Sequence, residues 1–340
     1  MDLFKGWTTA RVLTITAVVI ALLIITLVPS ASGPSPPFSF AVGVGPRWLA
    51  DAILNLVLFV PLGLALAWNS ESPFPAVVCG LLLSIAVEIA QIKVPGRDPA
   101  LSDIIFNTLG VTVGAFIGRG HRLWLAPNVA QSRTLTVLSV VTVGWVLIMT
   151  AVLLAPIQAS DFAASRVGDD LVLRYPSRGS ELGLDEPEYW ASDAFSGSRG
   201  AHNSPASLLQ DKARWQVTMW TGDRATLGPT VGKGWSLLAY PDAIGRHWSS
   251  VLDGLWILAL CVPIGFWARG RLRLIAGITV IALLLLVPWL TGIVSTRTIE
   301  WAGAAIGFFL GSVLASPGTR ASTMRPVQNR SERSDVARPT

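Results

Sequence analysis

The sequence has little cysteine, histidine or charge. It contains 2 Cys and 3 His among 340 residues, and 14% of its residues are charged. Cys79 and Cys261 both lie in apolar runs, so no disulfide framework is expected. Neither the spacing of a zinc site nor a Ser-His-Asp or Cys-His arrangement is present. The sequence therefore predicts no metal and no other cofactor.

Long hydrophobic runs dominate the chain instead. Hydrophobic residues make up 51% of the sequence, and the mean hydropathy is +0.55, values typical of an integral membrane protein. Runs of roughly 17 to 25 apolar residues suit a bilayer core about 30 Å thick. We expect eight such spans, at 11–29, 49–68, 76–92, 102–118, 133–155, 251–268, 273–292 and 299–315.

The positive residues predict the orientation of the chain. A net charge of +5 would suggest a nucleic-acid partner in a soluble protein, but here Lys and Arg gather in alternate loops between the spans. We therefore expect no nucleic-acid partner. Both termini are predicted to be cytoplasmic, and the long segment 157–249 is predicted to lie outside.

An internal repeat relates the two halves. DAILNLVLFVPLGL, from Asp51, recurs without a gap as DGLWILALCVPIGF, from Asp253. Further on, three spaced glycines also recur, and we align Gly110, Gly114 and Gly118 with Gly303, Gly307 and Gly311. That alignment places Asp103 and Asn107 opposite Thr296 and Glu300. It predicts a 4+4 parallel repeat with one working copy and one apolar scaffold copy.

The fold class expected from these features is an all-α polytopic membrane bundle with a small extracytoplasmic β-rich insertion. The predicted domains are a four-helix block (1–132), a fifth transmembrane helix (133–156), the insertion (157–249), a degenerate second repeat (250–316) and a disordered basic cytoplasmic tail (317–340).

Three segments of the insertion have strand-like patterns: Asp169–Tyr175, Ala213–Trp220 and Gly234–Tyr240. Tryptophans are frequent here, and a carbohydrate or a protein is a possible partner of this region. Tryptophan in a small β core or at the membrane interface is the commoner situation. The tryptophans concerned are Trp190, Trp215, Trp220, Trp235 and Trp248.

Polar residues concentrate in the first block. Glu88 and Gln91 share a stripe on one predicted helix, and Asp103 and Asn107 share a stripe on the next. The predicted topology places both stripes, the loop residue Arg97, and Asp51 with Asn55 at the same membrane face. Polar groups in membrane spans usually face the bundle or water.

This arrangement suggests Glu88 and Asp103 as acid/base residues and Arg97 as an anion clamp. The predicted binding residues are Arg97, Gln91, Asn107, Asn55 and Asp51. A structural role is the open alternative: Glu88 or Asp103 pairs with Arg97 and locks the hairpin, or Asp103 caps its own helix.

The same residues resemble a known family. Glu88-x-x-Gln91, Pro95-Gly96-Arg97 and Asp103-x-x-x-Asn107-x-x-Gly110-x-x-x-Gly114, preceded by Asn55 and FVPLG, are similar to the VanZ-like family of bacterial membrane proteins, named for the teicoplanin-resistance accessory protein. The resemblance implies a multi-pass protein of the bacterial inner membrane with a role in the cell envelope. It implies no particular reaction, and whether this chain is an enzyme stays open.

Three functions are compatible with these features. The first is binding, with or without modification, of an anionic lipid-linked envelope component or other membrane lipid at the outer face. The second is a non-enzymatic scaffold that recognises a partner through the insertion. The third is a transporter, although transport sites usually lie near the bilayer midplane and these polar groups are predicted near one face.

Overall fold

The computed structural model describes residues 8–29, 37–43, 45–157, 163–167, 170–190, 205–211, 213–219, 224–239 and 246–315. Within these ranges, seven helices are long and apolar enough to cross a membrane. They are α1 (Thr9–Leu27), α2 (Trp48–Ala67), α3 (Phe74–Gln91), α4 (Leu101–Arg119), α6 (Val129–Leu153), α10 (Arg246–Trp267) and α11 (Arg271–Thr291). The eighth expected span is the shorter apolar helix α12 (Thr298–Leu314).

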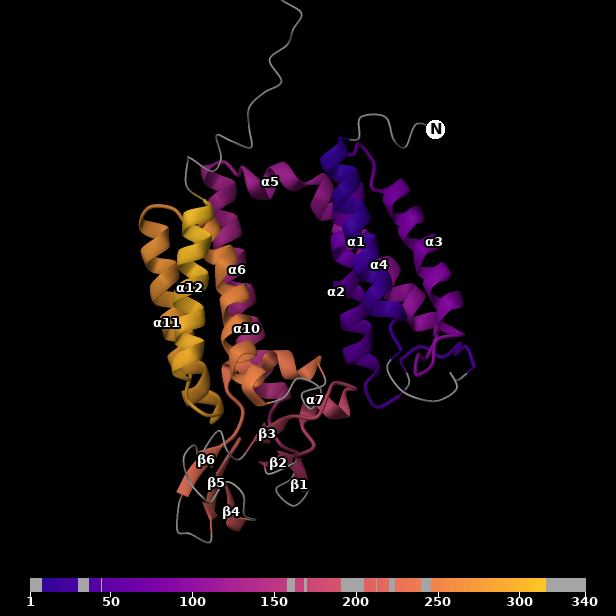
Figure 1. Ribbon diagram of the computed structural model, residues 1–340. Helices are drawn as coiled ribbons and strands as arrows, with labels where there is room; N and C mark the ends of the chain where they lie inside the picture. The colour runs from indigo at the N-terminus through magenta and orange to yellow at the C-terminus, as the bar shows by residue number, and fades with distance from the viewer. Residues whose placement is uncertain are drawn as a thin grey trace, which may run out of the picture.

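The helices form two groups (Figure 1). One contains α1 to α4, and the other contains α6, α10, α11 and α12. The short helix α5 (His121–Leu125) joins them at one end, and the strands lie at the opposite end (Figure 1). The chain is therefore a multi-pass membrane protein, and its described strands lie beyond one end of the helices.

Two helix pairs pack backbone to backbone through glycine. We call α2 with α4 the first helix pair, and α10 with α12 the second. A Cβ atom added at Gly63 or Gly114 would lie 2.0 Å from a carbonyl oxygen of the facing helix. Added at Gly265 or Gly311, it would lie 2.0 or 2.1 Å from one. Small residues allow this close approach in membrane helices.

The glycine contacts correct the sequence alignment by one turn. Gly114 faces the carbonyl of Val60, and Gly311 faces that of Val262. Val60 and Val262 are equivalent in the alignment from Asp51 and Asp253, so Gly114 corresponds to Gly311 and not to Gly307. The glycines on α4 and on α12 are each four residues apart. An alignment shifted by one turn therefore still matches most of them, and the sequence alone does not fix the register.

This correction changes which polar residues correspond. Asp103 is equivalent to Glu300, eleven residues before Gly114 and Gly311 respectively, and Asn107 is equivalent to Ala304. Thr296, previously aligned with Asp103, precedes the start of α12. The correspondence concerns the two helix pairs, and the complete fourfold repeat stays a prediction.

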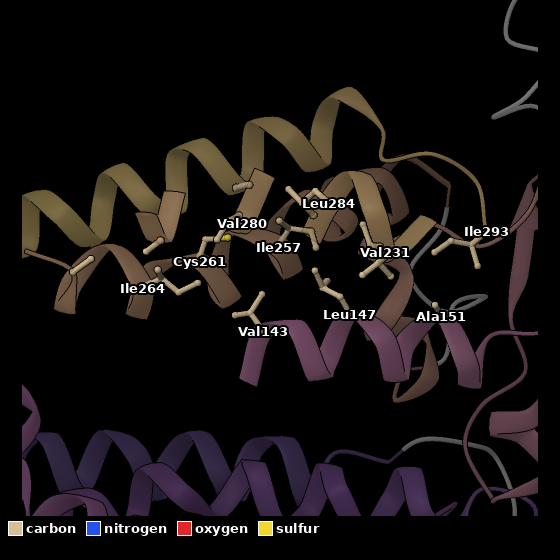
Figure 2. Close-up of a cluster of buried hydrophobic side chains, with 14 of the residues drawn as sticks. Val143, Leu147, Ala151, Val231, Ile257, Cys261, Ile264, Val280, Leu284 and Ile293 are labelled. Atoms are coloured by element: carbon tan, nitrogen blue, oxygen red, sulfur yellow. The ribbon is translucent and has the colours of Figure 1, made fainter. Parts of the chain in front are cut away.

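The second group has a continuous apolar core. It contains Val143 and Leu147 of α6, Ile257 of α10, and Val280 and Leu284 of α11 (Figure 2), and α11 packs directly against α6. Ile257 and Leu284 are each 1% exposed. Figure 2 also places Val231 at the end of this core, although it lies far from any span in the sequence.

The insertion contains two antiparallel three-stranded sheets in its described part. The first has β1 (Ala163–Val167), β2 (Asp170–Arg174) and β3 (Glu188–Trp190), and the second has β4 (Pro205–Asp211), β5 (Arg214–Met219) and β6 (Arg224–Leu227). The strands predicted at 169–175 and 213–220 are confirmed. Trp215, on β5, is 1% exposed and belongs to a core.

The strand predicted at Gly234–Tyr240 is wrong. Val231–Leu237 forms a 3-10 helix, η3, whose seven residues are all buried. Its glycines meet other elements closely: a Cβ at Gly232 would lie 2.3 Å from a Glu300 carboxylate oxygen, and one at Gly234 would lie 2.7 Å from Thr150 Oγ1. Tertiary contact with the helices has overridden the local alternating pattern. The predicted tail (317–340), Trp220 and the side chain of Trp190 lie outside the described residues.

Candidate functional site

The polar residues predicted in the first block come together at one end of the first helix group. Asp51 is in the first turn of α2, Glu88 is in the last turn of α3, and Asp103 is in the first turn of α4. These helix ends lie at the same end of the molecule as the strands (Figure 1). We call the first cluster the set Asp51, Asn55, Glu88, Gln91, Arg97, Asp103 and Asn107.

Glu88 fixes the start of α4. Its side chain is 2% exposed, and its Oε2 accepts a hydrogen bond of 3.0 Å from the backbone N–H of Ala100, the residue that precedes α4. Ala100 has no side-chain oxygen with which to cap the helix, and the first N–H groups of a helix have no partner within it. Glu88 supplies an acceptor at this position from the neighbouring helix.

Arg97 and Gln91 hold the end of α1. Arg97 donates from Nε to the carbonyl of Val28 (3.0 Å) and from Nη2 to that of Ile25 (2.7 Å). Gln91 Nε2 donates to the carbonyl of Thr26 (2.9 Å). A cation is favourable at a helix C-terminus, where carbonyls lack partners. The edge of Arg97 formed by Nε and Nη2 is thus occupied by α1, and neither Glu88 nor Asp103 forms an ion pair with Arg97 in the described part of the chain.

Asp51 and Asp103 form the accessible part of the cluster. Asp51 is exposed and Asp103 is half-buried, and the two carboxylates are close enough to interact electrostatically. Ser102 Oγ donates a hydrogen bond to Asp103 Oδ1 at 3.3 Å, and Asn55 lies near Asp103. Unlike Glu88, these two carboxylates are not buried.

Asn107 lies one turn deeper and leaves an acceptor open. It is 2% exposed, and its Nδ2 donates to Ser84 Oγ (3.0 Å). Its Oδ1 is buried and accepts no hydrogen bond from any described residue. An unpartnered buried acceptor typically costs about 1–3 kcal/mol, so this oxygen would gain from a donor.

The second helix pair carries a buried polar cluster of its own, which contradicts the expected dry scaffold. The second cluster consists of Lys233 from η3, Asp253 from α10 and Glu300 from α12. Asp253 and Glu300 are 0% exposed and Lys233 is 3% exposed. Lys233 Nζ lies 3.6 Å from Asp253 Oδ1 and also donates to Ser249 Oγ. Its ammonium is therefore paired in the interior, as buried charges require.

Glu300 is hydrogen-bonded through both carboxylate oxygens. Oε1 accepts from the backbone N–H of Gly232 (2.8 Å), and Oε2 accepts from that of Arg297 (2.7 Å). Arg297 precedes α12 as Ala100 precedes α4. The capping carboxylate thus comes from Glu300 itself in the second pair, but from Glu88 of α3 in the first.

Sequence reasoning missed the second cluster for two reasons. The glycine alignment was off by one turn, so Glu300 was placed opposite Asn107 and not opposite Asp103. Lys233 sits beside a segment with a strand pattern and far from the spans in sequence. The recurrence of Asp51 as Asp253 was the one sequence feature that pointed to an acidic cluster in the second helix pair. In the described ranges, no group of three or more His, Cys, Asp or Glu residues could hold a metal ion.

One comparison with known proteins gives a match. Residues 10–124 match a family model described as VanZ/LLP1. The matched region contains every residue of the first cluster and ends before α6, so the second helix group lies beyond it. No curated protein and no solved structure matches the chain.

Proposed function

We propose that this protein, which is VanZ-like over residues 10–124, binds a membrane lipid or a lipid-linked component of the bacterial cell envelope at the outer face of the inner membrane. The observation that carries the proposal is the accessible carboxylate pair Asp51 and Asp103, held where three helix ends meet. Ionisable residues within membrane helices are rare, usually face the bundle interior or a water-filled cavity, and are candidates for a functional site.

The distribution of charge supports an outward-facing site. Arginines gather at the end of the helices opposite the first cluster, and such positive residues mark the cytoplasmic side. The residues are Arg119, Arg122, Arg133, Arg269, Arg271 and Arg273. This distribution supports the proposal that both termini are cytoplasmic and that the strands lie outside.

The residues of the first cluster then divide into two roles. Asp51 and Asp103 contact the ligand, with Asn55 and Asn107 as orienting amides. Glu88, Gln91 and Arg97 position the ends of α1 and α4 through the hydrogen bonds to their backbones. If a bond of the ligand is broken, Asp103 is the acid or base, because Glu88 is engaged by Ala100.

Complementation of a deletion strain tests the proposal. Asp51→Asn and Asp103→Asn, expressed at wild-type level, should fail to restore the wild-type profile of membrane lipids and lipid-linked precursors. Glu71→Gln is the matched control, since Glu71 is exposed between α2 and α3, at the other end of the helices. Full restoration of every envelope phenotype by both Asp variants would refute the proposal.

The scaffold alternative makes the opposite prediction. It requires the strands and not the carboxylates, so replacing 188–219 by a short linker, which keeps Gly183 and Asp185 at the start of α2, should abolish function while Asp103→Asn has no effect. The deletion has to leave η3 intact, because Lys233 is paired with Asp253 inside the second helix group. The transporter alternative fits less well, since Asp51, Glu88 and Asp103 all lie within one turn of a helix end.

A further inference from the structure

We propose that Asp51 and Asp103 receive a primary ammonium group of the ligand, together with a neighbouring N–H or O–H donor. The inference rests on the proposed function and names the chemistry of the group bound. It comes from the second helix pair, in which equivalent carboxylates already hold an ammonium and an N–H group that belong to this same chain.

The equivalence has two independent supports. Asp51 and Asp253 correspond in an alignment without gaps. Asp103 and Glu300 correspond because Gly114 and Gly311 contact equivalent carbonyls, those of Val60 and Val262. The two carboxylates therefore occupy matching positions on matching helices.

The second pair shows what such carboxylates bind. Lys233 Nζ pairs with Asp253, and the adjacent residue in the sequence, Gly232, donates its backbone N–H to Glu300 at 2.8 Å. Trp235 Nε1 also donates to Asp253 Oδ1, at 2.8 Å. Every one of these groups is a hydrogen-bond donor, and one short segment of chain supplies them all.

The first pair presents the same acceptors to the outside. Asp51 is exposed and Asp103 half-buried, whereas Asp253 and Glu300 are completely buried beneath η3. Glu88 bonds the N–H of Ala100, so Asp103 is not needed for the capping that Glu300 performs. The buried Oδ1 of Asn107 is a further acceptor on the same face of α4 as Asp103.

The surrounding charges favour a cationic group. Arg47 pairs with Asp185 at 2.9 Å, and Arg97 bonds the end of α1. Asp98, in the loop before α4, interacts electrostatically with both Asp51 and Asp103 and adds negative charge. A primary ammonium offers three N–H donors, while a quaternary ammonium has the same charge and none. An anionic phosphate elsewhere in the ligand is compatible with this assignment.

Two candidate ligands carry a primary ammonium. Phosphatidylethanolamine has one in its headgroup, and a lipid-linked peptidoglycan precursor can have one in a lysine side chain of its peptide. Both should be tested on the purified full-length protein by native mass spectrometry. For each, the N-acetyl derivative removes the charge and the trimethylated derivative keeps the charge but removes the donors. Phosphatidylcholine is the trimethylated derivative of the first lipid.

We expect at least one of the two unmodified lipids to bind, and both of its derivatives to bind about tenfold more weakly, as loss of a charge-assisted hydrogen bond implies. Asp51→Asn and Asp103→Asn should cause a similar loss for the unmodified lipid only, and Glu71→Gln should cause none. Which lipid binds identifies the source of the ammonium.

A lipid and its two derivatives could bind equally well while the Asp variants still weaken that binding. This result would overturn the assignment of an ammonium group as the bound group and would leave the proposed function standing. Binding of neither lipid nor of any derivative would overturn both. Binding of the unmodified lipid that is unaffected by either Asp variant would overturn the assignment to Asp51 and Asp103.

Discussion

The first and second helix pairs share a backbone and differ in what covers their carboxylates. In both, glycine brings the facing helices into backbone contact, and each helix of the pair carries one acid of a matched set, Asp51 and Asp103 in the first pair and Asp253 and Glu300 in the second. In the second pair η3 buries the acids completely, while in the first they remain accessible. The two helix pairs therefore share acidic positions, and they differ in the group that occupies the space beside the acids.

The largest loss of stability is expected where glycine brings the two helices of a pair into backbone contact. Gly114→Ala and Gly311→Ala should each destabilise the protein by more than about 3 kcal/mol, above ordinary overpacking, because the new methyl group meets a backbone carbonyl that cannot turn away. Thermal melting in detergent, with the yield of monodisperse protein, measures this loss.

Gly277→Ala is the control for these two variants. A Cβ at Gly277 would lie 3.7 Å from Phe308 Cζ, which is an ordinary contact. Its melting temperature should stay close to that of the wild type. If Gly114→Ala were harmful and Gly311→Ala harmless, the two pairs would not share their packing.

The second-largest loss of stability is expected from removal of the Lys233 ammonium. Lys233→Met should cost about 3–5 kcal/mol, because it takes the paired cation from the buried carboxylate of Asp253. Adding Asp253→Asn should recover part of that loss, since no buried charge then remains at the pair. Chemical unfolding in detergent gives both values.

Lys93→Met provides the comparison, because Lys93 is exposed in the loop after α3. It should change the unfolding free energy by no more than about 0.5 kcal/mol. A Lys233→Met variant as stable as Lys93→Met would show that the ammonium does not hold the second cluster together.

Part of the fold and of the candidate site is predictable from the sequence. Hydropathy located the seven described helices that are long enough to cross a membrane and also the shorter helix α12, and the spacing of Glu88 and Asp103 placed them correctly at neighbouring helix ends. The role of Arg97 was not predictable, because its partners are backbone carbonyls of α1, which have no sequence signal. Likewise η3 depends on contacts with α10 and α12, and a local strand pattern cannot report them.

A smaller difference is expected between the two capping carboxylates. Glu300→Gln should destabilise by about 1–3 kcal/mol, because glutamine has one acceptor oxygen and Glu300 accepts N–H bonds on both. Glu88→Gln keeps its single bond to Ala100 and should cost less than about 1 kcal/mol. Equal losses, measured by thermal melting of the two variants side by side, would contradict the different capping arrangements.

The smallest effect on stability is expected at the accessible carboxylate. Asp103→Asn should change the unfolding free energy by no more than about 0.5 kcal/mol, since the side chain is half-buried and not needed to cap α4. The same variant should lose complementation of the deletion strain. A strong loss of stability would mean that Asp103 is structural, as Glu300 is.

The most direct test compares thiol reactivity at one matched pair of positions. Asn55 and Ile257 are equivalent in the gap-free alignment, and neither is one of the carboxylates. Asn55→Cys and Ile257→Cys should be made in a Cys79→Ala background, in which the remaining Cys261 is 1% exposed. Each is treated in intact cells with membrane-impermeant thiol reagents, one cationic and one anionic.

We expect Asn55→Cys to react, and to react roughly tenfold faster with the cationic reagent, because Asp51 and Asp103 attract it. Ile257→Cys should not react above the background strain, since Ile257 is 1% exposed beneath the second cluster. Equal reactivity at the two positions, or faster reaction of Asn55→Cys with the anionic reagent, would contradict the account.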